Sequence, residues 1–260
     1  MFAFSLAGLI VGAAVGLTGV GGGSMMTPWL IYGFGLPPVS AVGTDLLFSG
    51  ATKAFGAALH GRQNTIAWRI VFCMALGSVP GVLITLCALR ALSQWGGVPH
   101  GLITGVLSIA LLGTGLGILL RTGMRRLGTA AAPNWLLTLR RPSRLGAVTA
   151  GVGFLLGISV TLSSVGAGAI GTVFLMGLYP ELTASEVVGT DVTHAVLLSL
   201  LAGFGHASIG TVEPSVLTAL LVGSLPGMYL GTRLGHGVPD RVLRHTLAMG
   251  LVVLGAGMLL

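Results

Sequence analysis

Charge is the scarcest feature of this sequence. Only 7% of its 260 residues are Asp, Glu, Lys or Arg, while 53% are apolar and the mean hydropathy is +0.97. A typical soluble domain has about 25% charged residues, so this composition excludes a soluble protein. Cysteine occurs only at Cys73 and Cys87, which lie in one apolar segment and are interpreted as small buried hydrophobes rather than a disulfide.

Two further absences narrow the function. No nucleotide-binding loop and no polar domain is present, so the sequence excludes ATP-driven transport within this chain as far as motifs can, and we expect no cofactor. The net charge of +7 does not indicate nucleic acid, because the Arg residues cluster between apolar segments. Such clusters are typical of the cytoplasmic loops of membrane proteins.

Apolar segments recur along the whole chain, each near the roughly 20 residues needed to span a bilayer. After an uncharged run over residues 1–36, we expect helices over residues 37–59, 70–89 and 101–120. A polar segment with six Arg residues follows at 121–144. The sequence therefore predicts an all-α polytopic membrane protein, divided into a first transmembrane repeat (1–120), a basic cytoplasmic linker (121–144) and a second transmembrane repeat (145–260).

The second half repeats the first. Val20-Gly21-Gly22-Gly23 matches residues 165–168 at an offset of 145, and an offset of 146 then holds without a gap. This second register aligns Gly43-Thr44-Asp45 with residues 189–191, and Gly77-Ser78-Val79-Pro80-Gly81 with residues 223–227. Agreement of separate motifs in one register indicates a duplicated unit.

The placement of Arg decides between two topologies. If the glycine-broken segment of each half crosses the membrane, the halves are parallel, and eight Arg lie inside against four outside. If that segment is re-entrant, each half has three true spans and the halves are inverted. Eleven Arg then lie inside and only Arg90 lies outside. The positive-inside bias favours inverted repeats, each with a re-entrant half-helix pair and three transmembrane helices.

The glycine breaks predict a binding site. Three consecutive glycines are each unfavourable by about 1 kcal/mol relative to Ala in a helix, so the backbone should unwind there and line a cavity. We expect a new helix to start with Thr27 as its N-cap and Pro28 as its first residue. Bare N–H groups and helix dipoles at such a break suit an anion. The predicted substrate-binding residues are Gly21, Gly22, Gly23, Ser24, Thr27, Thr44, Gly166, Ala167, Gly168 and Thr190.

Two carboxylates lie within apolar helices. Asp45 is about 12 Å beyond the expected helix start, at 1.5 Å per residue, and Asp191 lies at the matched depth. Ionised carboxylates there are unfavourable by several kcal/mol. Two roles stay open: ion coupling, or a bond to the unwound backbone that holds the repeats together.

Two more residues could act with these carboxylates. His194 lies three residues after Asp191 and could pair with it or relay a proton. Lys53 is too far along the helix to pair directly with Asp45. It either extends to the membrane interface, which we favour, or neutralises an anion or a carboxylate across the repeat. For His60 and His206, which end their helices at matched positions, we expect a structural role.

Several motifs together resemble a known family. The Gly-rich break before Pro28, the Ala41-Val42-Gly43-Thr44 start of a helix, the His60-Gly61 exit and the run at residues 77–81 are similar to the sulfite exporter TauE/SafE family. The resemblance recurs in the second half and implies an inner-membrane permease for sulfur-containing anions such as sulfite, sulfonates or sulfoacetate. Many members have Gly-Thr-Ser where this chain has Gly-Thr-Asp, which implies a different substrate or altered ion coupling.

We therefore expect a multi-pass secondary transporter of the cell inner membrane, and not an enzyme. It would move a small anion by alternating access at a midplane site between the repeats. An anion channel is the alternative. An intramembrane aspartyl enzyme is less favoured, because Thr rather than Gly precedes each Asp. The expected partners are the small anionic substrate, the lipid bilayer and a coupling proton or cation, with no nucleic acid; a homodimer is left open.

Overall fold

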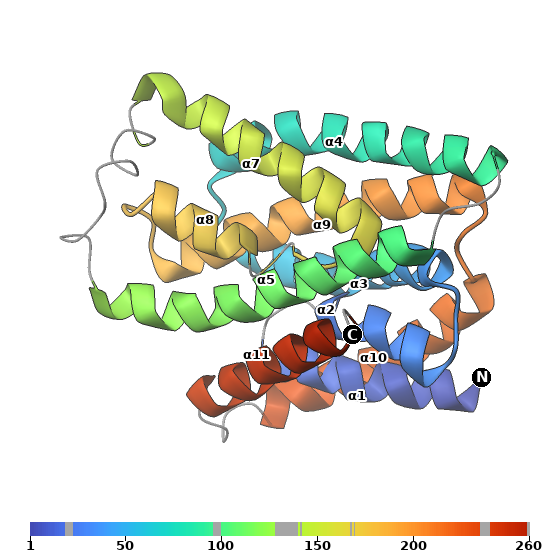
Figure 1. Cartoon of the computed structure of the whole chain (residues 1–260). Coiled ribbons are helices and arrows are strands. Elements are labelled where there is room, and N and C mark those ends of the chain that lie inside the picture. The colour runs from blue at the N-terminus through green and yellow to red at the C-terminus, as the bar shows by residue number, and fades with distance from the viewer. Residues whose placement is uncertain are drawn as a thin grey trace.

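The computed structural model describes residues 1–18, 23–95, 100–127, 140, 142–166, 168, 170–234 and 240–258, and within these ranges it contains helices and no strand (Figure 1). The first half consists of α1 (Phe2–Thr18), α2 (Gly23–Pro28), the π-helical η1 (Trp29–Gly33), α3 (Pro38–Arg62), α4 (Trp68–Gln94) and α5 (His100–Leu127). The second half consists of α7 (Pro142–Ser163), α8 (Ile170–Leu178), α9 (Ala184–Ile209), α10 (Pro214–Leu234) and α11 (Asp240–Gly257). The all-α prediction is confirmed.

Both halves have the same order of elements. A long helix is followed by a break, a short helical piece and three more helices, so that α1 corresponds to α7, and α3 to α9. Pro38, Pro142 and Pro214 each begin a helix, where the missing N–H is no loss. The segment 121–144 contributes its two ends to α5 and α7, because α5 continues to Leu127 and α7 begins at Pro142.

The predicted helix start after the first break is wrong by one turn. Thr27 and Pro28 do not begin the helix, since α2 starts at Gly23 and contains both residues. Pro28 lacks an N–H to donate to the preceding turn, and the chain continues directly in the wider turns of η1. This leaves the Thr27 side chain inside a helical turn rather than at a cap, and frees its hydroxyl for a different partner.

The two halves interlock through glycine-lined helix pairs. α1 packs against α10 of the other half, where Gly8 and Gly12 face the backbone of Leu220 and Ser224. The repeat-related pair is α7 and α4. A Cβ atom at these glycines would collide with the opposing backbone, so the small residues set how closely the helices approach. The α10 ladder of Gly223, Gly227 and Gly231 is therefore occupied by α1 of the same chain.

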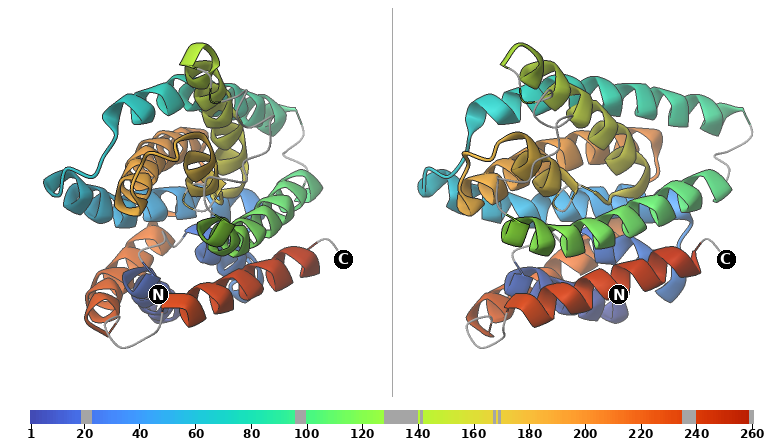
Figure 2. Two further views of the ribbon diagram at one scale, coloured as in Figure 1. Left: turned by 90° about the vertical axis from the view of Figure 1, so that its left-hand side faces the viewer. Right: turned by 60° about the vertical axis from the view of Figure 1, so that its left-hand side comes forward.

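α3 and α9 form the centre of the molecule and run antiparallel. Gly43 near the start of α3 lies against His206 near the end of α9, and Gly189 near the start of α9 lies against His60 near the end of α3. The pair α4–α7 lies on one side of these helices and the pair α1–α10 on the other (Figures 1 and 2). Asp45 of α3 and Asp191 of α9 are thereby enclosed by apolar helices.

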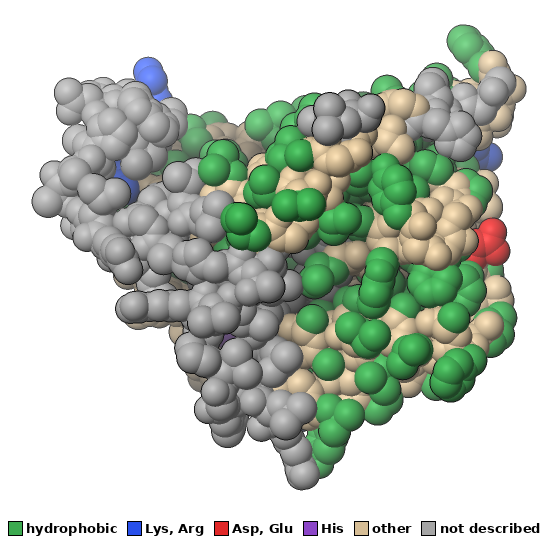
Figure 3. Space-filling view, turned by 60° about the horizontal axis from the view of Figure 1, so that its bottom comes forward, with side chains coloured by type: hydrophobic (Ala, Val, Ile, Leu, Met, Phe, Trp, Pro, Cys, Tyr) green, Lys and Arg blue, Asp and Glu red, His purple; other side chains and the backbone are tan. Residues whose placement is uncertain are grey.

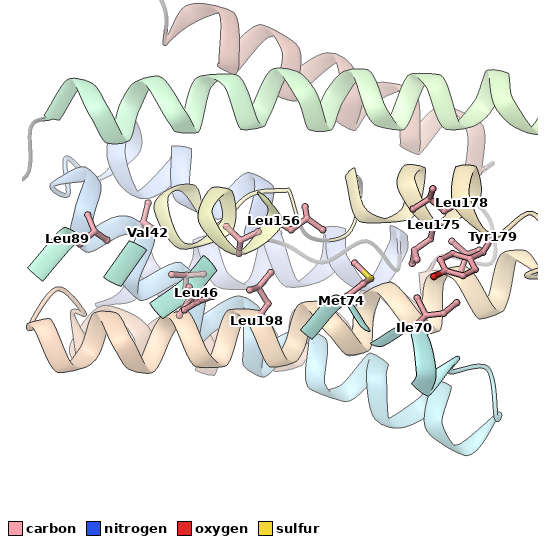
Figure 4. Close-up of a cluster of buried hydrophobic side chains, with 14 of the residues drawn as sticks. Val42, Leu46, Ile70, Met74, Leu89, Leu156, Leu175, Leu178, Tyr179 and Leu198 are labelled. Carbon is pink, nitrogen blue, oxygen red and sulfur yellow. The ribbon is translucent and has the colours of Figure 1, made fainter. Parts of the chain in front are cut away.

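The largest core cluster is built from both halves. Leu46 of α3, Met74 of α4, Leu156 of α7 and Leu198 of α9 are all at most 3% exposed and pack in one cluster (Figure 4). Leu175 of α8 is part of the same cluster, so the short helix after the second break is anchored in the core. In a bilayer these contacts stabilise the fold by van der Waals packing, since lipid tails are as apolar as the side chains.

The outer surface is suited to lipid. Hydrophobic side chains cover much of the described part of the face in Figure 3, and the coloured charged side chains lie at its margins. Among the described residues, five helical segments are long and apolar enough to cross a membrane: Trp68–Gln94, Gly101–Ile118, Arg144–Ser163, Ala184–Ile209 and Pro214–Gly231. α3 has 25 residues but is less apolar than these five, which fits its position inside the molecule.

Candidate functional site

Each intramembrane carboxylate is bonded to the short helix of its own half. Asp45 of α3 is fully buried and accepts a hydrogen bond from the Thr27 hydroxyl of α2. Asp191 of α9 is 1% exposed and accepts a hydrogen bond of 2.9 Å from Thr172 of α8. The two Thr–Asp pairs occupy matched positions of the repeat, so each Asp ties a central helix to the segment that follows a glycine break.

The Thr bonds leave part of the Asp45 carboxyl without a partner. Its Oδ1 atom has no hydrogen bond in the described part of the chain. Ser164, at the end of α7, lies near the carboxyl but makes no well-formed hydrogen bond with it. Burying an ionised carboxylate is unfavourable by several kcal/mol, which a single hydroxyl does not offset. Asp45 is thus held in place without being fully compensated.

The second glycine break is confirmed in its backbone. Gly166 and Gly168 have φ values of +114° and +119°, which favour glycine, and Ser164 has φ of +58°. The Thr172 hydroxyl also donates a hydrogen bond to the carbonyl of Gly168, so this Thr joins the non-helical segment at the break to Asp191. Of the other predicted residues at the breaks, Gly23 begins α2, while Gly21, Gly22, Ala167 and the side chain of Ser24 lie outside the described residues.

Lys53 lies where α3 and α9 cross. Gly50, one turn before it, packs against Leu200 of α9. The repeat relates Gly50 to Val196, which is only one turn from Leu200. The axis that relates the two halves therefore passes close to this crossing, and Lys53 stands beside it. Asp45 and Asp191 lie two turns away in opposite directions along the antiparallel pair.

The Lys53 side chain is buried rather than extended to the interface. It is 5% exposed, so the favoured snorkelling interpretation is wrong. Its ammonium makes no hydrogen bond or direct ion pair with any described residue, yet its charge interacts with both Asp45 and Asp191. The physical reason is that other helices cover the side of α3 that carries Asp45, Ser49 and Lys53, while Phe55 lies on the exposed side. The Lys53 ammonium thus interacts electrostatically with both the Asp45 and the Asp191 carboxylates, and it forms a salt bridge with neither.

Two buried hydroxyls missed by the sequence analysis lie in the same region. Ser49 lies midway between Asp45 and Lys53, so the three side chains form one stripe on α3 at intervals of four residues. Ser199 of α9 is the repeat equivalent of Lys53. Both hydroxyls are fully buried and have no hydrogen-bond partner in the described part of the chain. The four-residue spacing from Asp45 was the available signal for Ser49.

His194 is bonded away from the carboxylate. Its Nε2 atom lies 2.9 Å from the Ser78 hydroxyl of α4, and this is the one hydrogen bond of the ring within the described chain. The ring is fully buried, and its Nδ1 atom has no partner there. His194 therefore links α9 to the Gly-Ser-Val-Pro-Gly run of α4, and a proton relay to Asp191 stays a prediction.

Thr44 and Thr190 join the two halves at helix starts. The Thr44 hydroxyl accepts a hydrogen bond of 3.0 Å from the backbone N–H of Glu213, just before α10. Thr190 accepts a bond of 2.9 Å from the N–H of Ala67, just before α4. These reciprocal contacts give both residues a structural role, as caps across the halves, and their predicted contact with substrate stays a prediction.

The matched histidines are also structural, as expected. His60 Nδ1 lies 2.8 Å from the Thr65 hydroxyl, and His206 Nδ1 lies 2.9 Å from that of Thr211. Each ring stabilises the turn that leaves its helix and packs against a glycine of the other half. Over the described residues, no group of three or more His, Cys, Asp or Glu side chains is arranged to hold a metal ion.

Comparison with known proteins identifies the family. The family model described as Sulfite exporter TauE/SafE matches residues 4–258. The chain belongs to the TauE/SafE family. It is similar to "Probable membrane transporter protein YjnA" of Bacillus subtilis (strain 168), with 37% identity over 251 residues, which is 96% of each chain. A second B. subtilis relative, "Probable membrane transporter protein YdhB", is 26% identical over 95% of each chain.

The family match and these relatives show that the chain is a membrane transporter of the TauE/SafE family. With its apolar helices, it is a multi-pass membrane protein. No solved structure matches the chain. The family model covers nearly the whole chain. This agrees with the sequence analysis, in which the motifs at residues 41–44 and 77–81 recur in the second half.

Proposed function

We propose that this protein is a secondary transporter of the cell inner membrane that moves a small anion, a sulfur oxyanion or an organosulfonate, by alternating access between its two halves. The observation that carries the proposal is the buried ammonium of Lys53, which closes no ion pair with a described residue. A buried charge is stable only when it is paired. The free hydrogens of Lys53 are therefore available to an anionic substrate.

The surrounding residues support a site at this place. Lys53 stands beside the axis between the halves, where a substrate would contact both of them during alternating access. The unpartnered hydroxyls of Ser49 and Ser199 are buried nearby on α3 and α9 and can donate hydrogen bonds to an oxyanion. The family description, which names sulfite export, supports a sulfur-containing anion. Backbone N–H groups at the glycine breaks would complete the site, as the sequence predicts.

The two carboxylates give the transporter a coupling ion. With an anion bound, ionised Asp45 and Asp191 would place like charges close together in a buried region. The stable state has the carboxyls protonated, or paired with a cation such as Lys53 or a bound ion. Anion movement is then linked to movement of a proton or cation, and the carboxylates have a role in transport beyond holding the fold.

The arrangement of the halves supports inverted repeats. α3 and α9 are equivalent helices that run antiparallel, and their contacts are reciprocal. Equivalent helices point in opposite directions across a membrane only when the two halves have opposite orientation. Together with the Arg distribution, this supports a cytoplasmic linker and re-entrant half-helix pairs in which α1 and α7 are the first arms.

Flux into proteoliposomes tests the proposal. Purified protein is reconstituted and supplied with sulfite, methanesulfonate, acetate and sulfate. We expect saturable uptake of sulfite and methanesulfonate, and a loss of at least tenfold in the Lys53→Gln variant, because the substrate loses its buried counter-charge. Arg90→Gln is the matched control, since it removes one exposed positive charge from the end of α4.

Two outcomes would count against this function. If Lys53→Gln is folded and transports at the wild-type rate, Lys53 does not bind the anion. If uptake does not saturate and simply follows the electrochemical gradient of the anion, the protein is a channel.

A further inference from the structure

The buried centre of the molecule contains two carboxylates and one ammonium group. Asp45, Asp191 and Lys53 are at most 5% exposed and interact electrostatically. If all three are ionised, the centre has one net negative charge. Leaving a net charge inside a protein without a partner is unfavourable by several kcal/mol. The neutral resting state therefore has Lys53 charged, one carboxylate ionised and the other protonated.

No other described charge alters this balance. The histidines near α3 and α9 are bonded elsewhere: His194 to Ser78, and His60 and His206 to the threonines of their exit turns. The remaining described charged side chains on or beside the elements packed against α3 and α9 lie near helix ends or in loops. Arg140, which donates a hydrogen bond to the Gly177 carbonyl of α8, and Glu186 are partly buried. The others are exposed: Arg62, Arg69, Arg90, Arg144, Glu181 and Glu213. The Tyr229 side chain of α10 is also exposed, at 55%.

The single cation at the centre breaks the symmetry of the repeat. Every member of the two Thr–Asp pairs has its counterpart, but Lys53 faces Ser199 at the equivalent position. A symmetric centre would have two ammonium groups and two carboxylates and would be neutral when empty and fully ionised. With Ser in place of a second Lys, one carboxylate must hold a proton, and the buried Ser199 hydroxyl has no hydrogen-bond partner among the residues that the structure describes.

The effect of a bound anion follows from the same count. One monovalent anion adds one negative charge to a neutral centre, and the ionised carboxylate restores neutrality by taking up one proton. A divalent anion would need a second proton, and no further ionised carboxylate is available at the centre among the described residues. The hydroxyls of Ser49 and Ser199 donate hydrogen bonds to the oxygens of the anion but carry no charge.

We infer that the site, if it has the transport function proposed above, takes one monovalent oxyanion together with one proton and moves no net charge. The substrate class is thereby narrowed to singly charged sulfonates, hydrogen sulfite and similar anions. Doubly charged oxyanions such as sulfate are excluded from the wild-type site.

Steady-state accumulation in proteoliposomes measures this stoichiometry without any variant. With methanesulfonate as the probe, we expect the ratio of internal to external anion to rise about tenfold for each unit by which the interior is more alkaline. An imposed potential of 100 mV should leave the ratio unchanged. A carrier that moves one net charge would instead change its accumulation roughly 50-fold under that potential.

Each other outcome overturns the inference in a recognisable way. A potential-dependent ratio shows that net charge moves, and a ratio set by a sodium gradient shows that the coupling ion is not a proton; both leave the proposed transport intact. Absence of flux for every anion, in protein that elutes as a single folded species, rejects the proposed function itself.

A variant of the asymmetric position gives an independent test. Ser199→Lys adds a second ammonium, so we expect sulfate uptake at least tenfold above that of the wild type. Ser199→Ala is the control and should leave sulfate excluded. Should Ser199→Lys fail to fold, the accumulation experiment on the wild-type protein still decides; if it folds and excludes sulfate, the charge count does not set the selectivity.

Discussion

At the scale of single residues, the site combines symmetric and asymmetric positions. The pairs Thr27–Asp45 and Thr172–Asp191 are duplicated, while Lys53 is matched by Ser199 and its charge has no counterpart. In the alternating access that we propose, the two carboxylates would be exposed in turn to each side of the membrane. The single ammonium, beside the axis, stays within electrostatic reach of both.

The Asp45→Asn and Asp191→Asn variants test the carboxylates directly. Asn is nearly isosteric with a protonated Asp and still accepts the Thr hydroxyl, so we expect folding and anion binding to persist. Accumulation driven by a pH difference should fall from about tenfold per unit to no accumulation when the two substitutions are combined, because each single variant still has one titrating carboxylate. Uptake of methanesulfonate against a range of pH differences measures this.

The control for these variants is Glu213→Gln, which removes an exposed carboxylate. If the variant that combines Asp45→Asn with Asp191→Asn keeps the pH dependence of the wild type, the carboxylates are structural and the coupling proposal fails.

At the scale of helices, close packing and function are divided between different elements. α3 and α9 contain the buried ionisable groups, and the surrounding pairs α1–α10 and α4–α7 pack through glycine. Lipid offers apolar helices no hydrophobic gain on association, so van der Waals contact at the glycine faces must hold these pairs together. Side-chain volume at that interface should therefore affect stability strongly.

Gly12→Ala tests this packing. A Cβ atom at Gly12 would collide with the Ser224 backbone, and backbone cannot move aside as a flexible side chain does. We expect destabilisation of about 1–3 kcal/mol, seen as a lower midpoint of thermal unfolding in detergent. Gly250→Ala in α11 is the matched control, because nothing lies within 4 Å of its added methyl group, and it should be neutral or stabilising.

Equal unfolding midpoints for Gly12→Ala and the wild type would show that the α1–α10 interface relaxes more easily than its backbone contacts indicate.

At the scale of the whole molecule, the antiparallel centre relates the position of the site to membrane topology. The apolar outer face and the five apolar helical segments place the molecule in a bilayer. With α3 and α9 antiparallel, an inverted arrangement would put both termini on the side opposite the linker, and we propose that the Arg-rich linker lies in the cytoplasm.

Reporter fusions after Leu260 test this arrangement. We expect a periplasmic C-terminus, with high activity of a periplasm-dependent reporter such as alkaline phosphatase and low activity of a cytoplasmic one. A fusion within residues 128–139 should show the opposite pattern. A cytoplasmic C-terminus would reject the inverted arrangement and restore four spans in each half.

Much of the helical layout was predictable from sequence, because it depends on local chemistry and on duplication. Helices begin at Pro38, Pro142 and Pro214, and Gly166 and Gly168 adopt the positive φ angles that break a helix. The offset of 146 residues transfers each such feature from one half to the other. Burial of Asp45 and Asp191 also followed from their depth in apolar segments.

The local pattern misled at the first break, where Thr27 and Pro28 form a plausible cap and first residue. The helix begins at Gly23 instead, since Thr27 gains a buried hydrogen bond to Asp45 that a cap position would not provide. That bond joins residues 18 apart, so no local pattern shows it.

The sequence by itself determined which residues are polar in an apolar chain and that several of them, such as Thr44, Asp45 and His60, occur twice. Only the tertiary structure decided which way they face. Lys53 is buried because neighbouring helices cover its side of α3, His194 bonds to Ser78 because α4 crosses α9 there, and the glycine ladder of α10 is filled by α1. The physical reason is that the backbone hydrogen bonds of a helix do not depend on how the helix is rotated about its axis. Which side chains face inward is therefore set by the segments, distant in sequence, that pack against it.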